Sequence, residues 1–117
     1  MYVTVEEFIA AAEKNGYQWS NDGTWVETDD KGYVTRACVL GQAAINLGIA
    51  VEGMWNPLNS LDPYHAVARE IYWYNDTYAL NYDQAVAKLK EVLEPYKGKT
   101  MKFRKKRYKV RRNEVHS

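Results

Sequence analysis

The most restrictive feature of this sequence is the separation of its charges. Residues 97–117 contain ten Lys or Arg and one Glu, whereas residues 1–96 contain six Lys or Arg and fourteen Asp or Glu. The two segments therefore carry formal charges of +9 and −8, which the net charge of +1 conceals. Such asymmetry is typical of a globular body joined to an interaction tail. We predict an acidic, helix-rich globular domain over residues 1–97 and a basic C-terminal tail over residues 98–117.

The length and composition are those of one small intracellular domain. With 117 residues, 46% of them hydrophobic, the chain can bury a core without disulfides. Its single cysteine, Cys38, excludes an internal disulfide and suits a reducing compartment. The opening residues MYVTVEEF do not resemble a signal peptide, and no apolar stretch reaches the ~20 residues of a membrane span. We expect a soluble cytoplasmic protein with no membrane partner.

Helix-start signals and apolar stripes predict four helices. Thr4, with Glu7 three residues later, forms the reciprocal capping pattern in which each side chain bonds the other's main-chain N–H. Val5 and Phe8 then begin an apolar stripe with helical spacing. Comparable caps and stripes predict three further helices over about residues 39–47, 62–75 and 81–95, the last two antiparallel.

Two further signals concern the start of the third helix and the interior of the second. Asp62 as N-cap and Pro63 at the first helical position mark the start of the third helix, and residues 51–61 before it are predicted to form a loop. Gly41 lies inside the second helix at a cost of ~1 kcal/mol relative to Ala. Close approach of another backbone would offset this cost.

Residues 25–38 predict a β-hairpin. Its two strands are rich in β-branched and aromatic residues, and Asp29-Asp30-Lys31-Gly32 between them suits a tight turn. The segment has the outline of a calcium-binding loop, but Lys31 and Cys38 occupy positions that need oxygen ligands. We therefore interpret Asp29 and Asp30 as turn residues. The expected fold class is α+β, with four helices, one β-hairpin and a basic extended C-terminal tail.

The sequence offers one candidate nucleophile, Cys38, where the hairpin meets the second helix. A helix N-terminus can lower the pKa of a thiol, and His65 can serve as a base. However, nothing in the spacing brings a base and an orienting group to the thiol, and free cysteines are usually buried. Zinc-ligand spacings, phosphate-binding glycine loops and nucleophile elbows are also absent from the sequence. We expect a non-enzymatic protein without cofactor or metal, in which Cys38 is structural.

An aromatic cluster within residues 64–82 indicates one candidate surface. Either the helix over residues 62–75 is central, with its tyrosine hydroxyls reaching solvent, or it presents aromatic side chains to a partner. Trp, Tyr and Arg are enriched at the hot spots of protein interfaces. The candidate residues for this protein-binding surface are Arg69, Tyr72 and Trp73.

The basic tail indicates a second candidate surface. Met101 and Phe103 alternate with polar residues, and Tyr108 and Val110 do so in the opposite phase, which predicts one or two short strands. A basic strand with aromatic residues can lie along phosphates and stack on bases. It can equally dock on the acidic body of its own or another chain, or remain disordered. The candidate binding residues are Lys99, Lys102, Phe103, Arg104, Lys105, Lys106, Arg107, Tyr108, Lys109, Arg111 and Arg112.

The segment RACVLGQAAINLGI contains Cys38, Gly41, Leu47 and Gly48 in the spacing C-x2-G-x5-L-G. With this motif, residues 25–93 resemble small uncharacterised proteins of actinobacteria and their phages, in which a hairpin leads into a short Cys-containing helix and then a helix pair. Those proteins have no assigned activity, so the resemblance assigns no catalytic residue. It implies a phage or prophage accessory protein in a bacterial cytoplasm, and the basic tail departs from its pattern.

Two functions of different class follow from these features. The first is a non-enzymatic, phage-like accessory or regulatory protein that binds nucleic acid, DNA or RNA, or a host protein assembly through the basic tail. The alternative is a protein–protein interaction module that uses the aromatic surface of the helix over residues 62–75, with the tail neutralising acidic surface. Salt-dependent binding through the tail distinguishes the first function from the second.

Overall fold

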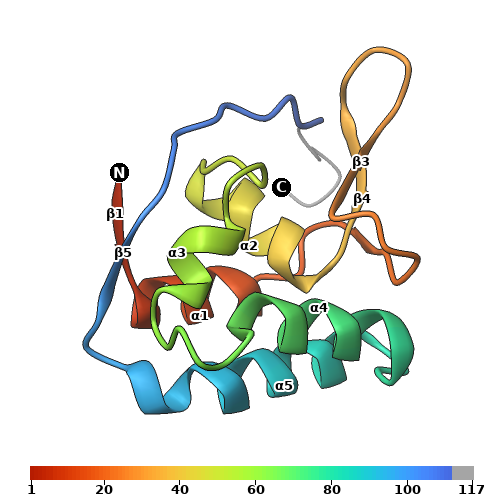
Figure 1. Ribbon diagram of the computed structural model, residues 1–117. Helices are drawn as coiled ribbons and strands as arrows, with labels where there is room; N and C mark the ends of the chain where they lie inside the picture. Colours follow the sequence, from red (N-terminus) through yellow and green to blue (C-terminus); the bar gives the residue numbers. More distant parts are fainter. Residues whose placement is uncertain (112–117) are drawn as a thin grey trace.

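The computed structural model describes residues 1–111, which form an α+β fold with five α-helices, one 3₁₀ turn and two small sheets (Figure 1). The α+β class is as predicted, but α3, β1 and β2 were not expected. None of the helices in residues 1–111 combines the length and hydropathy of a membrane span. The elements in chain order are β1 Tyr2–Thr4, α1 Val5–Glu13, β2 Gln18–Trp19, β3 Val26–Thr28, β4 Val34–Ala37, α2 Val39–Leu47, α3 Trp55–Asn59, α4 Val67–Thr77, α5 Tyr82–Leu93, η1 Glu94–Tyr96 and β5 Thr100–Lys102.

Helix α1 begins as its capping pattern predicts. The Thr4 hydroxyl accepts a hydrogen bond from the Glu7 N–H at 3.1 Å, and the Glu7 carboxylate accepts one from the Thr4 N–H at 2.9 Å. These bonds satisfy main-chain donors that a helix N-terminus otherwise leaves unpaired. The buried face of α1, which includes Phe8 and Ile9, is thereby aimed into the core.

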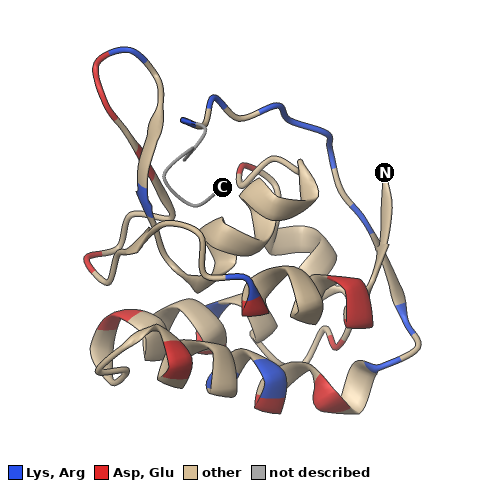
Figure 2. Ribbon diagram, turned by 180° about the vertical axis from the view of Figure 1, so that it is seen from behind, with Lys and Arg blue, Asp and Glu red and all other residues tan. Residues whose placement is uncertain are grey.

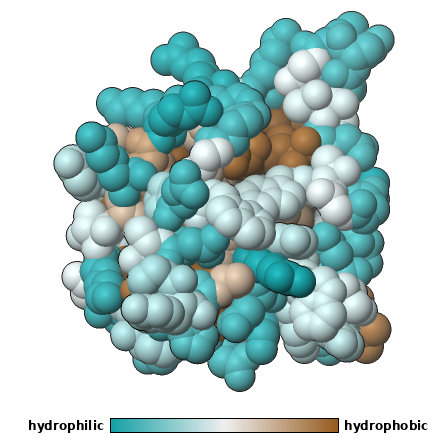
Figure 3. All heavy atoms as spheres, in the orientation of Figure 1, coloured by the Kyte–Doolittle hydropathy of each residue, from teal (hydrophilic) through white to brown (hydrophobic). Residues whose placement is uncertain are grey.

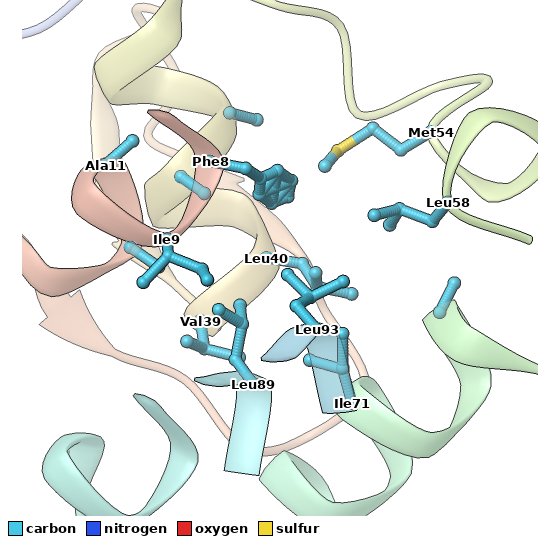
Figure 4. Packing of buried hydrophobic residues seen from close by; sticks show 14 of the residues in the cluster. Phe8, Ile9, Ala11, Val39, Leu40, Met54, Leu58, Ile71, Leu89 and Leu93 are labelled. Carbon is cyan, nitrogen blue, oxygen red and sulfur yellow. The ribbon is translucent and has the colours of Figure 1, made fainter. Parts of the chain in front are cut away.

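The core lies where α1 and α2 pack on α4 and α5, which run antiparallel as predicted (Figure 1). Figure 4 shows Phe8, Leu40 and Met54 beside side chains from α4 and α5. Each large apolar side chain removed from water in this way contributes roughly 1.5–3 kcal/mol. The fully buried side chains from the last two long helices include Ile71, Leu89 and Leu93.

Part of the basic C-terminal region also belongs to this core. β5 pairs antiparallel with β1, with Met101 opposite Val3. Met101 is 2% exposed and Phe103 is 5% exposed, and the Phe103 ring centroid lies 5.9 Å from that of Phe8. The core therefore extends past residue 98, where the charge of the chain changes sign.

The predicted hairpin is formed by β3 and β4, and its turn extends away from the helices (Figure 1). The Asp29 carboxylate accepts hydrogen bonds from the N–H groups of Lys31 and Tyr33, both at 2.9 Å, which confirms its turn role. The sequence did not predict β2, which pairs in parallel with β4 on the side opposite β3. Two-residue strands carry too little periodicity to be recognised.

The motif residues of α2 serve local structure. The Cys38 thiol caps the helix by accepting a hydrogen bond from the Gly41 N–H at 3.4 Å. A Cβ atom on Gly41 would lie 1.8 Å from the carbonyl oxygen of Trp25, which confirms the expected close approach of another backbone. Gly48 ends the helix with a φ of 72°, a conformation that glycine adopts readily.

The segment around residue 62 differs from the prediction. The helix predicted from Asp62 begins at Val67, and the predicted loop before it contains α3. The Asp62 side chain accepts a hydrogen bond from the Tyr64 N–H at 3.0 Å, so it forms a local turn and leaves Tyr64 94% exposed. The side-chain amide oxygen of Asn59, Oδ1, instead accepts a hydrogen bond from the Ala68 N–H in the first turn of α4. A side chain from the preceding helix therefore performs the capping that the sequence assigned to Asp62.

Candidate functional site

The basic segment, residues 99–111, crosses one side of the molecule from the end of η1 to the hairpin (Figure 1). Figure 2 shows Lys and Arg concentrated along it, whereas Asp and Glu gather on the helices and near the hairpin turn. Of the candidate binding residues in the tail, only Arg112 lies outside the described part of the chain. The basic segment is therefore a continuous cationic strip across the fold.

Main-chain hydrogen bonds hold the second half of the strip in place. The Arg104 carbonyl accepts from the Ala50 N–H at 2.8 Å, and the Lys106 N–H donates to the Gly48 carbonyl at 3.0 Å. Farther along, the Lys109 carbonyl accepts from the Val34 N–H at 2.8 Å. The second predicted strand is thus reduced to single bridges, one to the turn after α2 and one to the start of β4.

Tyr108 is the central anchor between these bridges. Its hydroxyl donates to the Ile49 carbonyl at 2.7 Å and accepts from the Val51 N–H at 3.2 Å. Burial raises the pKa of the Tyr108 hydroxyl, because removal from water disfavours the phenolate. The ring is therefore held against the body in its neutral form.

Two cations of the basic segment pair with carboxylates of the body. Lys106 Nζ lies 3.2 Å from a Glu52 oxygen, and Arg111 lies 3.2 Å from an Asp29 oxygen. A hydrogen bond to its own main chain, together with Lys106, holds the pKa of Glu52 below its ordinary value of 4.5. These contacts agree with one of the alternatives that the sequence left open, in which the tail docks on the acidic body of its own chain.

The hairpin contributes an aromatic ring to the same contact. The Tyr33 ring centroid lies 4.7 Å from Lys109 Nζ and 4.2 Å from the Arg111 guanidinium carbon. Cations at this distance are attracted to the electron-rich face of an aromatic ring. Lys109 Nζ also donates to the Lys31 carbonyl at 2.9 Å. The end of the strip is thereby joined to the hairpin turn.

The remaining cations differ in their contacts. Lys99 and Arg104 donate to main-chain carbonyls at 3.3 and 3.2 Å, and Lys102 lies 5.8 Å from the centroid of a tyrosine ring in β1. Lys105 and Arg107 are exposed and form no ion pair within residues 1–111. These two side chains are the ones best placed to meet an external anion.

Two hollows flank the strip where Tyr108 anchors it. Hollow 1 has a volume of about 470 Å³ and hollow 2 of about 350 Å³. Figure 3 shows hydrophobic atoms below the gap between the hairpin and the basic segment, the region of hollow 2. Hollow 1 is lined by Tyr17, Ile45, Gly48, Lys105, Lys106, Arg107, Tyr108 and Val110. Hollow 2 is lined by Val26, Thr28, Gly32, Val51, Glu52 and residues 106–109.

The alternative candidates, all on α4, differ in exposure. Tyr72 is half-buried, with its ring centroid 6.1 Å from that of Trp25 and 5.7 Å from that of Trp55. Arg69 is exposed, and Trp73 is 52% exposed. Tyr72 therefore contributes to packing between elements, whereas Arg69 and Trp73 remain accessible.

Cys38 is buried as expected, with 1% of its surface exposed. Burial raises the pKa of its thiol to about 12, so the thiol is protonated near neutral pH. A protonated, enclosed thiol is a poor nucleophile, and its observed role is the cap of α2.

Sequence reasoning identified the cations but not the groups that orient them. Glu52 and Tyr33, which contact the cations, and Tyr17, which lines hollow 1, were not singled out, and Asp29 was assigned only to the turn. The positive charge of the tail suits carboxylate partners. However, the two observed ion pairs, Lys106–Glu52 and Arg111–Asp29, join residues that are 54 and 82 positions apart in the sequence. No sequence periodicity encodes such distant pairings.

The chain was compared with protein-family models, curated proteins and solved structures. No family model, curated protein or solved structure matches it. Its functional assignment therefore depends on the chemistry of the strip and its flanking hollows.

Proposed function

We propose that this chain is a non-enzymatic nucleic-acid-binding protein whose basic segment contacts phosphates. The supporting observation is an anchored row of cations in which Lys105 and Arg107 are exposed and pair with no carboxylate in residues 1–111. Side chains two residues apart on an extended segment lie roughly 7 Å apart on the same side, a spacing that suits neighbouring phosphates. Lys102, exposed on β5, extends the row.

Anchoring favours binding because the segment needs little further ordering. Fixing the backbone of one flexible residue costs roughly 1–2 kcal/mol, so a disordered arm would lose much of its contact energy on binding. In this protein, the main-chain hydrogen bonds of Arg104, Lys106 and Lys109 already order the segment when the chain folds. The phosphate contacts can then contribute directly to affinity.

The biological setting that we propose follows from the resemblance in the α2 region. An accessory or regulatory protein of a phage or prophage, acting in a bacterial cytoplasm, would meet both nucleic acid and host assemblies. A cationic strip suits either an RNA or DNA strand or an acidic face of a host assembly. We favour nucleic acid because the strip also borders hollow 1, whose lining combines cations with the aromatic side chains Tyr17 and Tyr108.

The experiment compares two double variants with the same loss of charge. Lys105→Gln/Arg107→Gln removes the two exposed cations, and Arg69→Gln/Lys90→Gln removes two cations from α4 and α5. Deletion of residues 98–117 is unsuitable because it would remove Met101 and Phe103 from the core. Fluorescence anisotropy with single-stranded and duplex DNA and RNA, at several salt concentrations, measures the affinity.

We expect the strip variant to bind more weakly and with a flatter salt dependence. Each lost phosphate contact should reduce the log–log salt slope by about 0.7 on single strands and about 0.9 on duplex DNA. The α4–α5 variant should retain the wild-type slope. Absence of binding by the wild-type protein at low salt, or equal losses in the two variants, would disprove the proposal.

A second candidate function is favoured by the exposure of Trp73 and Trp55. These side chains are 52% and 40% exposed, and Trp is enriched at the hot spots of protein interfaces. In this alternative, the face of α4 binds another protein and the basic segment neutralises Glu52 and Asp29. Protein association that is lost in Trp73→Ala but retained in the strip variant would select this function.

A further inference from the structure

Hollows 1 and 2 share the basic segment but differ in the charge of their linings. Both include Lys106 and Arg107, yet the lining of hollow 2 also includes Glu52. Among residues 1–111, the lining of hollow 1 has three cations and no carboxylate. An anion in hollow 1 is therefore attracted by these described lining residues without opposition from a carboxylate among them, whereas an anion in hollow 2 is repelled by Glu52.

The uncharged part of hollow 1 has aromatic and aliphatic walls. Tyr17 and Tyr108 contribute rings, and Ile45 and Val110 contribute aliphatic surface. Val110 is 40% exposed, and Tyr17 and Ile45 are half-buried, so these side chains remain accessible to a ligand. The volume of about 470 Å³ lies within the range of natural small-molecule sites, roughly 300–1,000 Å³.

The walls are held in position by bonds from the body. Gln42 is fully buried, and its amide donates to the Tyr17 carbonyl at 3.1 Å and accepts from the Gly16 N–H at 3.2 Å. On the opposite side, the Tyr108 hydroxyl is bonded to the loop after α2. Hollow 1 is thus formed before any ligand arrives, which reduces the ordering cost of binding.

We propose that hollow 1 receives one unpaired base of a single-stranded nucleic acid, with its flanking phosphates on Lys105 and Arg107. This inference rests on the proposed nucleic-acid function and extends it by naming the form of the ligand. A flat base suits the aromatic walls, because every base has a π-face that can stack. Bases in a duplex are paired and stacked inside the helix, so they cannot enter hollow 1 without flipping.

The first measurement uses the wild-type protein with a short oligonucleotide that contains one 2-aminopurine. Stacking against an aromatic side chain quenches the fluorescence of this base, so we expect quenching on binding. Free 2-aminopurine ribonucleoside monophosphate is the second probe. The proposal predicts much weaker binding of this probe, because it lacks the phosphates on both sides. Equal affinity for the two probes would identify a free-nucleotide site and overturn the strand assignment.

The second measurement uses variants of the wall. Tyr17→Ala should lower affinity for the single strand by roughly 5- to 100-fold, as expected when one stacked base loses its aromatic partner. Affinity for a duplex of the same length should be unchanged, which also shows that the variant is folded. Tyr17→Phe keeps the ring and should bind as wild type. Tyr64→Ala removes an exposed tyrosine that does not line hollow 1 and serves as the matched control.

The outcomes separate this inference from the proposed function. If Lys105→Gln/Arg107→Gln weakens binding while 2-aminopurine is not quenched and Tyr17→Ala binds normally, the base site is wrong and the phosphate contacts stand. Equal losses on single strand and duplex in Tyr17→Ala would also overturn the base site. Absence of any nucleic-acid binding would remove both proposals.

Discussion

The two halves of the basic segment are both cationic but differ in how the fold holds them. Residues 99–103 place Met101 and Phe103 in the core and form a strand with β1. Residues 104–111 lie on the surface, where bridges, ion pairs and the Tyr108 hydroxyl hold them. Charge alone therefore does not mark the end of the folded body in this chain.

The difference shows which residues decide whether a basic run is folded. In the first half, two apolar side chains at alternate positions reach the core, so hydrophobic burial fixes the backbone and the intervening lysine faces outward. In the second half, Tyr108 is half-buried and Val110 is exposed. Polar contacts must then perform the anchoring, and each contributes less than a buried aromatic ring.

The largest expected effect is on stability in the first half. Phe103→Ala should lower the free energy of unfolding by about 3–5 kcal/mol, because it removes a buried ring that contacts Phe8. Val110→Ala in the second half should change it by about 0.5 kcal/mol or less, since that side chain is 40% exposed and does not belong to the core. Urea unfolding followed by circular dichroism measures both. Equal destabilisation by the two substitutions would contradict the division of the segment.

Tyr108→Phe should have an intermediate effect. The substitution removes the hydroxyl that bonds Ile49 and Val51, and we expect a loss of about 1–2 kcal/mol. Amide hydrogen exchange should accelerate at Ala50 and Lys106, whose N–H groups bridge the strip and the body. Tyr64→Phe, which alters an exposed hydroxyl, is the control. Unchanged exchange at both amides would show that the hydroxyl does not anchor the strip.

Sequence patterns predicted the elements whose signals are local. The capping pair Thr4 and Glu7, the turn at Asp29 and the glycine at position 41 each report a constraint within a few residues or one tight contact. The start of α4 was wrong because Asp62 and Pro63 suit a turn as well as a helix N-terminus. Asn59, which performs the capping, lies nine residues before the group that it bonds.

In the candidate site too, the sequence predicted the residues with local signals and missed those brought together by tertiary packing. Composition identified the cations, and alternation identified the strand at Met101. The partners Glu52 and Tyr33 depend on how the hairpin and the loop after α2 approach the segment, which is set by packing over the whole chain. Hollow 1 combines residues from the β2 region, α2 and the basic segment, so sequence spacing could not reveal it.

The smallest expected effect on stability is that of the Lys106–Glu52 ion pair, and it depends on pH. The pKa of Glu52 is lowered in the folded protein, so its contribution to stability is complete above its ordinary value of 4.5 and is lost as the pH falls through the lowered value. Both side chains are well exposed and screened by solvent, so the contribution at pH 7 should be at most about 1 kcal/mol. Glu52→Gln should therefore be slightly less stable than wild type at pH 7, and the difference should disappear once the pH lies below the lowered pKa of Glu52.

Unfolding experiments across this pH range, with Glu70→Gln as a control for loss of an exposed carboxylate, measure the difference. A difference that stays constant with pH would assign the effect of Glu52→Gln to packing rather than to charge. The same variant sharpens the functional comparison, because removal of the carboxylate frees Lys106 for an external phosphate. Glu52→Gln should then bind nucleic acid more tightly than wild type, although its free energy of unfolding is slightly lower. If the ion pair were purely structural, the substitution would lower the stability without raising the affinity.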